Sequence, residues 1–353
     1  MRGLPGLAKL DSAAASCGLV PLPASRAGVT AIPLIRAAAL HALPEILDRA
    51  GLMLAGSFPS QLQERGGPAL VPLHPVLTLL ARAAAMSDDP GIGVRLAEAG
   101  GLAALGDLGR HIRGAATLRE AIERTEAGIQ WLLPGARLRL GREGPWLLWQ
   151  AELPPRLGGD GAVARPWLLA LLRLVLRAAA GSAWRPVTLR SEHGRRLESA
   201  FGQPVIEDAV VTGLTFPAGL LQLAMPGPRT GSELAAVLEA TRAPADFAGS
   251  LRVLIRSLLS ETTVDAAEVA RLAGISLRSL QRSLAAGGLS FSELLREARL
   301  ERAIELMRHP AQRMTDIGLE LGYSDAANFT RAFRRWTGCS PRAYRRRLMQ
   351  EAA

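Results

Sequence analysis

Apolar residues recur with two different periods along this chain, and the change of period divides it into two parts. Before residue 250, some stretches have apolar residues at the 3.6-residue spacing of helices. Other stretches between them have an apolar residue at every second position, as strands do. Helices are predicted over 75–86, 117–129 and 166–180, and strands over 136–140, 146–151, 187–189 and 209–216. A turn at 141–145 makes the first two strands a hairpin. This part is therefore predicted to be an α+β domain.

After residue 250 the apolar spacing is helical throughout, which predicts an all-α domain. The expected helices are 250–260, 265–273, 276–286, 291–308, 315–321, 325–337 and 341–348. Pro244 and its small neighbours suit a short connection between the two parts. We therefore expect a loosely ordered leader over 1–29, an α+β domain over 30–241, a linker over 242–249 and an all-α domain over 250–348.

The segment 264–284 has the layout of a helix-turn-helix. Gly274 permits a tight turn, and Ser276 is placed to cap the helix that follows it. The predicted inward positions are Val269, Leu272, Leu280 and Leu284. The opposite face carries Arg278, Gln281 and Arg282, whose side chains suit guanine or adenine edges as well as phosphate.

The same layout recurs 48 residues later. Gly322 is the expected turn residue and Ser324 the expected cap. The buried stripe is predicted to be Phe329, Phe333 and Trp336, while Asn328, Arg331, Arg334 and Arg335 lie off it. The helix expected between the units, 291–308, measures about 27 Å at about 1.5 Å per residue. Because successive major grooves on one face of DNA lie about 34 Å apart, this spacer suits two recognition helices acting together.

Charge agrees with a nucleic-acid partner. The formal net charge is +10, and because Lys9 is the single lysine nearly all positive charge is guanidinium. Residues 250–353 carry a net +6 against +4 for the longer segment 1–249. The basic run Arg345 to Arg347 has two interpretations of equal weight. Its guanidinium groups either contact phosphate or simply stabilise a helix end through the macrodipole.

Composition and spacing argue against other classes of protein. Two distant cysteines, Cys17 and Cys339, favour a reducing cytoplasm over a disulfide framework or a structural zinc site. The apolar helix near 167–180 is too short to span a bilayer. The five histidines show no metal-ligand spacing, and we find no phosphate loop, dinucleotide fingerprint or nucleophile elbow. We therefore expect no enzyme, no cofactor, no metal and no membrane segment.

These motifs together resemble the AraC/XylS-type transcriptional regulators. The residues that match are 269–282, Arg299 with Ala303, Ile317 with Leu321-Gly322-Tyr323-Ser324-Asp325, and 329–345. The resemblance extends over about a hundred residues of the chain. By this resemblance the base-facing positions are Arg278, Gln281, Arg282, Ala326, Ala327 and Arg331. The full set of expected DNA-contacting residues is Ser276, Arg278, Ser279, Gln281, Arg282, Asp325, Ala326, Ala327, Asn328, Arg331 and Arg335.

Three positions depart from the family pattern. Ala326 and Ala327 stand where relatives often carry longer polar side chains, so the second helix is expected to read thymine methyl groups or mainly phosphate. Gly318 replaces the usual alanine, at a cost of about 1 kcal/mol of helix propensity unless a close helix contact requires glycine.

The N-terminal part resembles, less specifically, the effector-binding domain of the subgroup called arabinose-binding-like. The matching segments are 88–93, 105–109, 117–121 and 201–205. This resemblance implies a ligand-sensing or dimerisation module over roughly 30–240. Five tryptophans lie within 54 residues of this part, where they line either a ligand pocket or an ordinary core. They are Trp131, Trp146, Trp149, Trp167 and Trp184.

The sequence thus predicts a cytoplasmic, sequence-specific DNA-binding regulator, in keeping with an activator, that is controlled by a small-molecule effector at its N-terminal domain. The expected partners are double-stranded promoter DNA, an unidentified effector and, as the family implies, RNA polymerase. The sequence leaves monomer and homodimer open. The alternative interpretations are an effector-independent, constitutive DNA-binding regulator and an enzyme fused to a DNA-binding domain.

Overall fold

The computed structural model describes residues 31–52, 69–154, 157, 161–208, 210–244, 246–259 and 264–351. The leader expected over 1–29 lies outside these described residues. Within them, none of the helices combines the length and the apolar character that a bilayer crossing requires.

A five-stranded sheet is the framework of the N-terminal domain, with the strand order β3-β4-β7-β5-β6. Its strands are β3 (Arg137–Glu143), β4 (Trp146–Glu152), β5 (Thr188–Ser191), β6 (Ile206–Glu207) and β7 (Thr212–Pro217). All neighbours pair antiparallel except β5 and β6. The predicted hairpin is confirmed, but the predicted turn over 141–145 is too long. Pairing continues to Glu143 and Trp146, because the backbone ladder tolerates the polar residues of β3 at this edge of the sheet.

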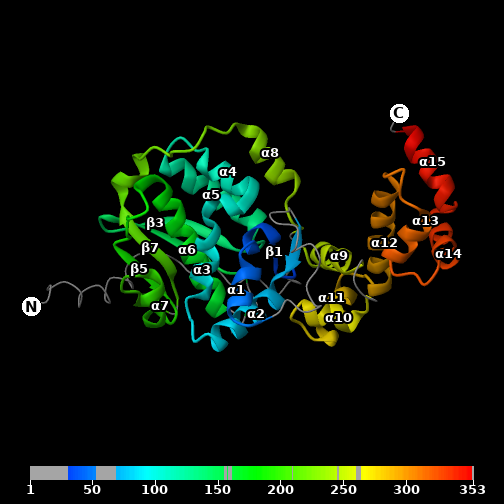
Figure 1. Cartoon of the computed structure of the whole chain (residues 1–353), viewed down its shortest axis with the longest axis horizontal. Coiled ribbons are helices and arrows are strands. Elements are labelled where there is room, and N and C mark those ends of the chain that lie inside the picture. Colours follow the sequence, from blue (N-terminus) through cyan, green and yellow to red (C-terminus); the bar gives the residue numbers. More distant parts are fainter. Residues whose placement is uncertain are drawn as a thin grey trace, which may run out of the picture.

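Helices of the N-terminal domain pack on this sheet and on one another (Figure 1). Their bounds are α1 (Leu43–Arg49), α2 (Leu73–Met86), α3 (Ile92–Gly100), α4 (Gly106–Arg113), α5 (Leu118–Leu132), α6 (Gly161–Ala180), α7 (Gly194–Phe201) and α8 (Ser232–Ala240). α5 and α6 contact the strands directly, and α3 packs along α6. The adjacent side chains Leu189, Leu214 and Trp149 are fully buried between these layers. The helix predicted over 166–180 is α6, which begins five residues earlier than predicted and contains Pro166.

A two-stranded ribbon connects the two domains. It consists of β1 (Leu34–Arg36) and β2 (Leu70–Pro72), which pair antiparallel. Ile35 and Val71 belong to the core of the N-terminal domain, whereas Ile32 and Leu34 are buried in the core of the C-terminal domain. Because successive side chains of a strand point to opposite faces, one short ribbon contributes to both cores.

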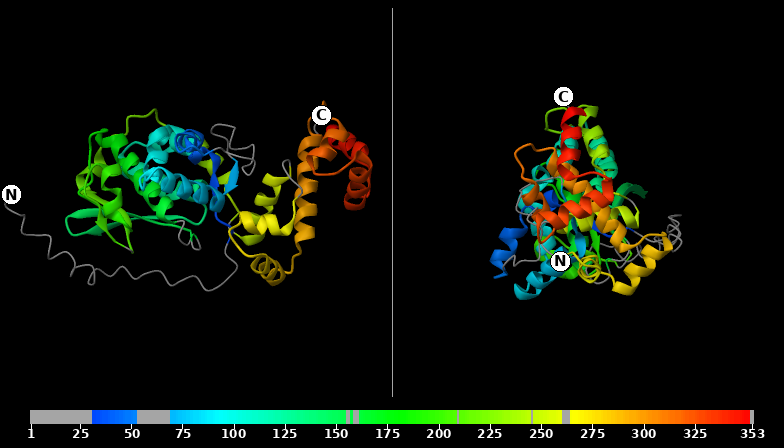
Figure 2. Two further views of the ribbon diagram at one scale, coloured as in Figure 1. Left: turned by 60° about the horizontal axis from the view of Figure 1, so that its bottom comes forward. Right: turned by 90° about the vertical axis from the view of Figure 1, so that its right-hand side faces the viewer.

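The C-terminal domain is all-helical among its described residues, as predicted. Its helices are α9 (Phe247–Leu258), α10 (Ala266–Leu272), α11 (Leu277–Ala286), α12 (Phe291–Met307), α13 (Met314–Glu320), α14 (Ala326–Thr337) and α15 (Pro341–Glu351). α9 begins three residues earlier than expected because Asp246 caps it, accepting the Gly249 N–H at 2.8 Å. α10 and α11 lie beside the N-terminal domain, and α12 carries α13 to α15 away from it (Figures 1 and 2).

Candidate nucleic-acid interface

The first helix-turn-helix consists of α10 and α11. Ser276 caps α11 as expected, since its hydroxyl accepts the Ser279 N–H at 3.1 Å. Gly274 in the turn has a φ of +68°, a left-handed conformation that favours glycine. The four predicted inward residues, Val269, Leu272, Leu280 and Leu284, are all buried. The apolar stripe thus fixes which side of α11 remains on the surface.

The surface side of α11 presents the polar residues that the sequence indicates. Arg278, Gln281 and Arg282 are exposed, as is Ser276, and Ser279 is half-buried. The Ser276 hydroxyl also donates to the Ser279 hydroxyl at 3.0 Å, so these two side chains hold each other at the start of the helix. The structure therefore brings all five predicted residues of the first unit to one end or one face of α11.

The second helix-turn-helix consists of α13 and α14, and aromatic side chains form its core. Phe329 and Phe333 are fully buried, with ring centroids 5.7 Å apart in an edge-to-face arrangement. Trp336 is half-buried and lies 6.3 Å from Phe333. Their predicted role as core is confirmed. Gly318 lies so close to this core that an added Cβ would stand 3.1 Å from the Phe329 Cβ, which is the close contact that glycine accommodates.

The cap of α14 is Asp325, and the expectation that Ser324 caps this helix is wrong. The Asp325 carboxylate accepts the Asn328 N–H at 2.6 Å. This backbone hydrogen bond is the main cause that holds the pKa of Asp325 below its ordinary value of 3.8. The serine hydroxyl instead hydrogen-bonds the carboxylate. Aspartate is favoured because its charge also interacts with the positive end of the helix dipole.

Polar side chains at the start of α14 form a connected row. The Asn328 amide donates to Asp325 at 2.7 Å and to Ser324 at 3.0 Å, and its carbonyl accepts from the Arg331 guanidinium at 2.6 Å. Arg331 and Arg335 are exposed, and together with Asn328 they line an open hollow of about 520 Å³. The two predicted alanines differ in exposure, with Ala327 exposed and Ala326 half-buried. The row places a preorganised guanidinium on the surface of α14.

The structure places two basic features of this domain in surroundings that the sequence did not predict. The Arg299 guanidinium lies 5.1 Å from the centre of the Tyr323 ring, so this arginine of α12 supports the turn before α14. The run Arg345 to Arg347 lies in the middle of α15, which extends to Glu351. The macrodipole explanation for this run is therefore wrong, because that effect is confined to the last turn of a helix.

The tryptophans of the N-terminal domain are mainly core residues. Trp131, Trp149 and Trp167 are each at most 5% exposed. The Trp149 indole donates to Glu126 at 3.1 Å, and burial raises the pKa of that carboxyl. Cavities beside Trp167 measure about 10 and 20 Å³, enough for about one water molecule. No group of three or more His, Cys, Asp or Glu side chains is placed to hold a metal ion within the part of the chain that is described.

A cleft of about 320 Å³ lies elsewhere in the N-terminal domain, between the end of β4, β7 and the start of α6. Its lining includes Glu152, Arg165, Leu168 and Thr212, and it contains no tryptophan. Arg165 forms an ion pair with Glu192. Sequence reasoning did not find this cleft, because its walls come together from segments that are distant along the chain.

Comparisons with known proteins agree with this architecture. A family described as a helix-turn-helix domain matches residues 269–347, and the family of the arabinose-binding domain of the AraC transcription regulator matches residues 43–225. The ornithine utilization regulator of Pseudomonas aeruginosa is 27% identical over 273 residues, covering 74% of this chain and 80% of that protein. The regulator VirS of Mycobacterium tuberculosis is 28% identical over 312 residues, covering 78% and 85%.

Among solved structures, the regulator CdpR of Pseudomonas aeruginosa is similar over 88% of this chain and 98% of its own, with 22% identity and a TM-score of 0.42. These relatives are named as transcription regulators, and their family is not one of enzymes. Since the N-terminal match alone spans more than half of the chain, the protein belongs to the AraC family of DNA-binding transcription regulators and carries an arabinose-binding-like N-terminal domain.

Proposed function

We propose that this regulator recognises promoter DNA by inserting α11 and α14 into successive major grooves. The observation that carries the proposal is the repeated arrangement at the two ends of α12. Each unit buries an apolar stripe and presents a capped helix start with exposed arginine on the other side. α12 has 17 residues, or about 25 Å of stiff helix, which suits two recognition helices that address neighbouring grooves.

The proposal assigns base contact chiefly to Arg278, Gln281, Arg282 and Arg331. Ser276, Ser279 and Asn328 would hold the helix starts and donate to phosphate oxygens, and the Asp325 carboxylate would hold the start of α14. Arg335 would contact phosphate, and Ala326 and Ala327 would contact thymine methyl groups. Discrimination between sequences would then come mainly from α11, because its arginines and glutamine offer bidentate hydrogen bonds to base edges.

The test begins with DNA that the wild-type protein selects from a random-sequence library. We expect R278A and R331A each to weaken binding to that DNA by roughly 5- to 150-fold, in line with about 1–3 kcal/mol for a good base contact. R119A removes the same charge from an exposed position on α5 and should leave affinity unchanged. Titrations across a salt series separate base recognition from phosphate attraction. Wild-type affinity in both arginine variants would contradict the assignment.

Effector control is the second part of the proposal. The cleft at the start of α6 has a volume within the range of small-molecule sites, about 300–1,000 Å³, and its lining offers both a carboxylate and a guanidinium. A ligand bound there would act by favouring the domain arrangement that binds it better, since equal affinity for both arrangements shifts nothing.

The ornithine utilization regulator and the arabinose-binding domain family suggest the first probes, L-ornithine and L-arabinose. A ligand at 100 times its Kd should stabilise the protein by about 2.7 kcal/mol, which a thermal melt detects. If neither compound nor a metabolite library stabilises the protein, the effector-independent alternative is favoured.

We further propose that the bound protein activates transcription by contacting RNA polymerase, as the family implies. Transcription from a template that carries the selected DNA upstream of a promoter should rise when the protein is added. A fall in transcript would identify a repressor instead. Gel filtration with light scattering on the same preparation distinguishes the monomer from the homodimer that the sequence leaves open.

A further inference from the structure

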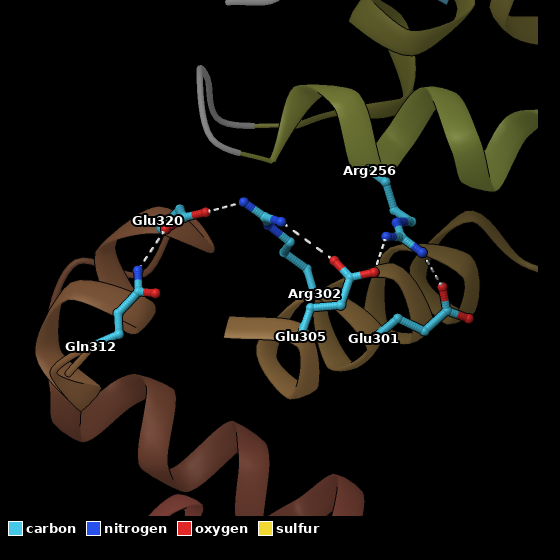
Figure 3. Close-up of polar contacts among 6 residues, drawn as sticks. All are labelled: Arg256, Glu301, Arg302, Glu305, Gln312 and Glu320. Carbon is cyan, nitrogen blue, oxygen red and sulfur yellow. Dashed lines mark hydrogen bonds and ion pairs between the residues drawn. The ribbon is translucent and has the colours of Figure 1, made fainter. Parts of the chain in front are cut away.

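A chain of charged side chains links the first helix of the C-terminal domain to the second helix-turn-helix (Figure 3). Arg256 of α9 donates to Glu301 at 3.2 Å and to Glu305, both on α12. The other oxygen of Glu305 accepts from Arg302 at 3.3 Å. The chain thus crosses from one helix to the next through a carboxylate that two guanidinium groups share.

The chain continues from α12 to α13. The Arg302 guanidinium donates to Glu320 at 2.6 Å, and the second oxygen of Glu320 accepts from the Gln312 amide at 3.2 Å (Figure 3). Glu320 is the last residue of α13, directly before the turn that leads into α14. Its carboxylate therefore ties the C-terminal half of α12 to the base of the second recognition unit.

A parallel contact fixes the register of α9 on α12. Arg252, one turn before Arg256, pairs with Glu297 at 2.8 Å, one turn before Glu301. Two rungs spaced by one turn on both helices oppose sliding of one helix along the other. Apolar packing supplies the adhesion between these helices. The ion pairs, which are directional, select one axial position and one rotation among those that apolar contact permits.

We propose that Glu305 and Glu320, acting through Arg256 and Arg302, are positioning residues that set the separation and rotation between α11 and α14. They thereby determine which spacing of two half-sites the protein accepts. The inference rests on the two-helix contact proposed above. Each partly exposed ion pair contributes little to stability by itself, but a shared network restricts orientation more than its separate pairs would.

The direction in which one substitution changes DNA affinity distinguishes a positioning role from a simple charge effect. E320Q removes a negative charge from the DNA-binding domain, so attraction to phosphate alone would tighten DNA binding. If Glu320 positions the second unit, the same change loosens that unit and weakens binding to DNA with the preferred spacing. E305Q tests the preceding link, because it disrupts the contacts to Arg256 and Arg302 together.

The experiment uses the full-length chain and DNA selected from a random library by the wild-type protein. Affinity is measured for that DNA, for a version with one base pair inserted between the half-sites, and for the first half-site alone. We expect the wild type to lose roughly tenfold affinity on insertion, and E320Q and E305Q to lose less than about threefold, since a loosened unit follows the displaced half-site. Both variants should bind the first half-site as the wild type does, which shows that they are folded.

E268Q is the matched control. It removes the same charge from α10, but Glu268 pairs with Arg271 of its own helix and forms none of these links between helices. It should keep the wild-type spacing preference. A full wild-type preference in both E320Q and E305Q would overturn the inference while leaving the proposed function intact. A wild type that is indifferent to the insertion would overturn both.

Discussion

The backbone N–H of Ile32 donates to the Ser250 hydroxyl at 2.8 Å, and both residues are buried although 218 positions separate them. Ser250 belongs to α9, the first helix of the DNA-binding domain, whereas Ile32 lies two residues before the ribbon that also contributes to the N-terminal core. The two domains therefore share more than a linker. A change in the N-terminal domain has a direct structural connection to the helix on which α12 is aligned.

Removal of the serine hydroxyl should destabilise this connection. S250A leaves the buried Ile32 N–H without its acceptor, which costs about 1–3 kcal/mol of unfolding free energy. Denaturant unfolding measures the loss. S257A is the control, because Ser257 is equally buried but donates to Leu254 within α9. A similar loss in both variants would show that the hydrogen bond between Ile32 and Ser250 contributes no more to stability than one within α9.

The turn of the first helix-turn-helix should tolerate no side chain. A Cβ at Gly274 would lie 2.8 Å from the His74 ring of α2, and the residue also has a φ of +68°. Gly288 has nearly the same φ, +66°, and no atom of the described residues lies within 4 Å of an added Cβ. Both G274A and G288A should lose about 1–2 kcal/mol through backbone strain. G274A should lose further stability because of the contact with His74. The additional substitution H74A should restore part of this further loss. Equal melting curves for the two alanine variants would contradict this contact.

Acid should weaken the second recognition unit through its cap. The pKa of Asp325 is lowered in the folded protein, so its contribution to stability is complete above the ordinary value of 3.8 and is lost as pH falls through the lowered value. D325N keeps a capping side chain that does not titrate. Thermal melts from about pH 6 to about pH 3 should show the wild type losing more stability than D325N. Parallel curves would argue against the cap as an acid-sensitive element.

Loss of the Asn328 side chain should impair specific binding more than folding. N328A frees the Arg331 guanidinium, which must then be ordered when DNA binds, at about 0.5–1.5 kcal/mol for one side chain. Affinity for selected DNA should fall roughly threefold to tenfold, with little change for random DNA. T330A removes a hydroxyl that bonds Ala326 of its own helix, and it serves as the control. A parallel loss on random DNA would mean that Asn328 acts on the fold.

Local patterns in the sequence are sufficient to predict most of the DNA-binding domain. Its helices are short and amphipathic, and the residues that begin and end them are close neighbours, as with Ser276 and Ser279. The buried stripe of α14 was predictable for the same reason, since Phe329 and Phe333 are one helical turn apart. Competition between two adjacent capping residues was not predictable, and Asp325 rather than Ser324 caps α14 because charge strengthens its interaction with the helix start.

The elements that follow from neighbouring residues alone are the helices of the DNA-binding domain, the helices α2, α5 and α6 with the hairpin of the N-terminal domain, and the glycine turns of the two helix-turn-helix units. Together they suffice to indicate the family. Tertiary structure decided the contacts between residues far apart in the chain. These include the ribbon shared by two cores, the Gly274 contact with His74, the cleft beside α6 and the ion-pair chain from Arg256 to Glu320. No periodicity encodes them, because a charged residue on a helix surface has the same pattern whether its partner is water or another helix.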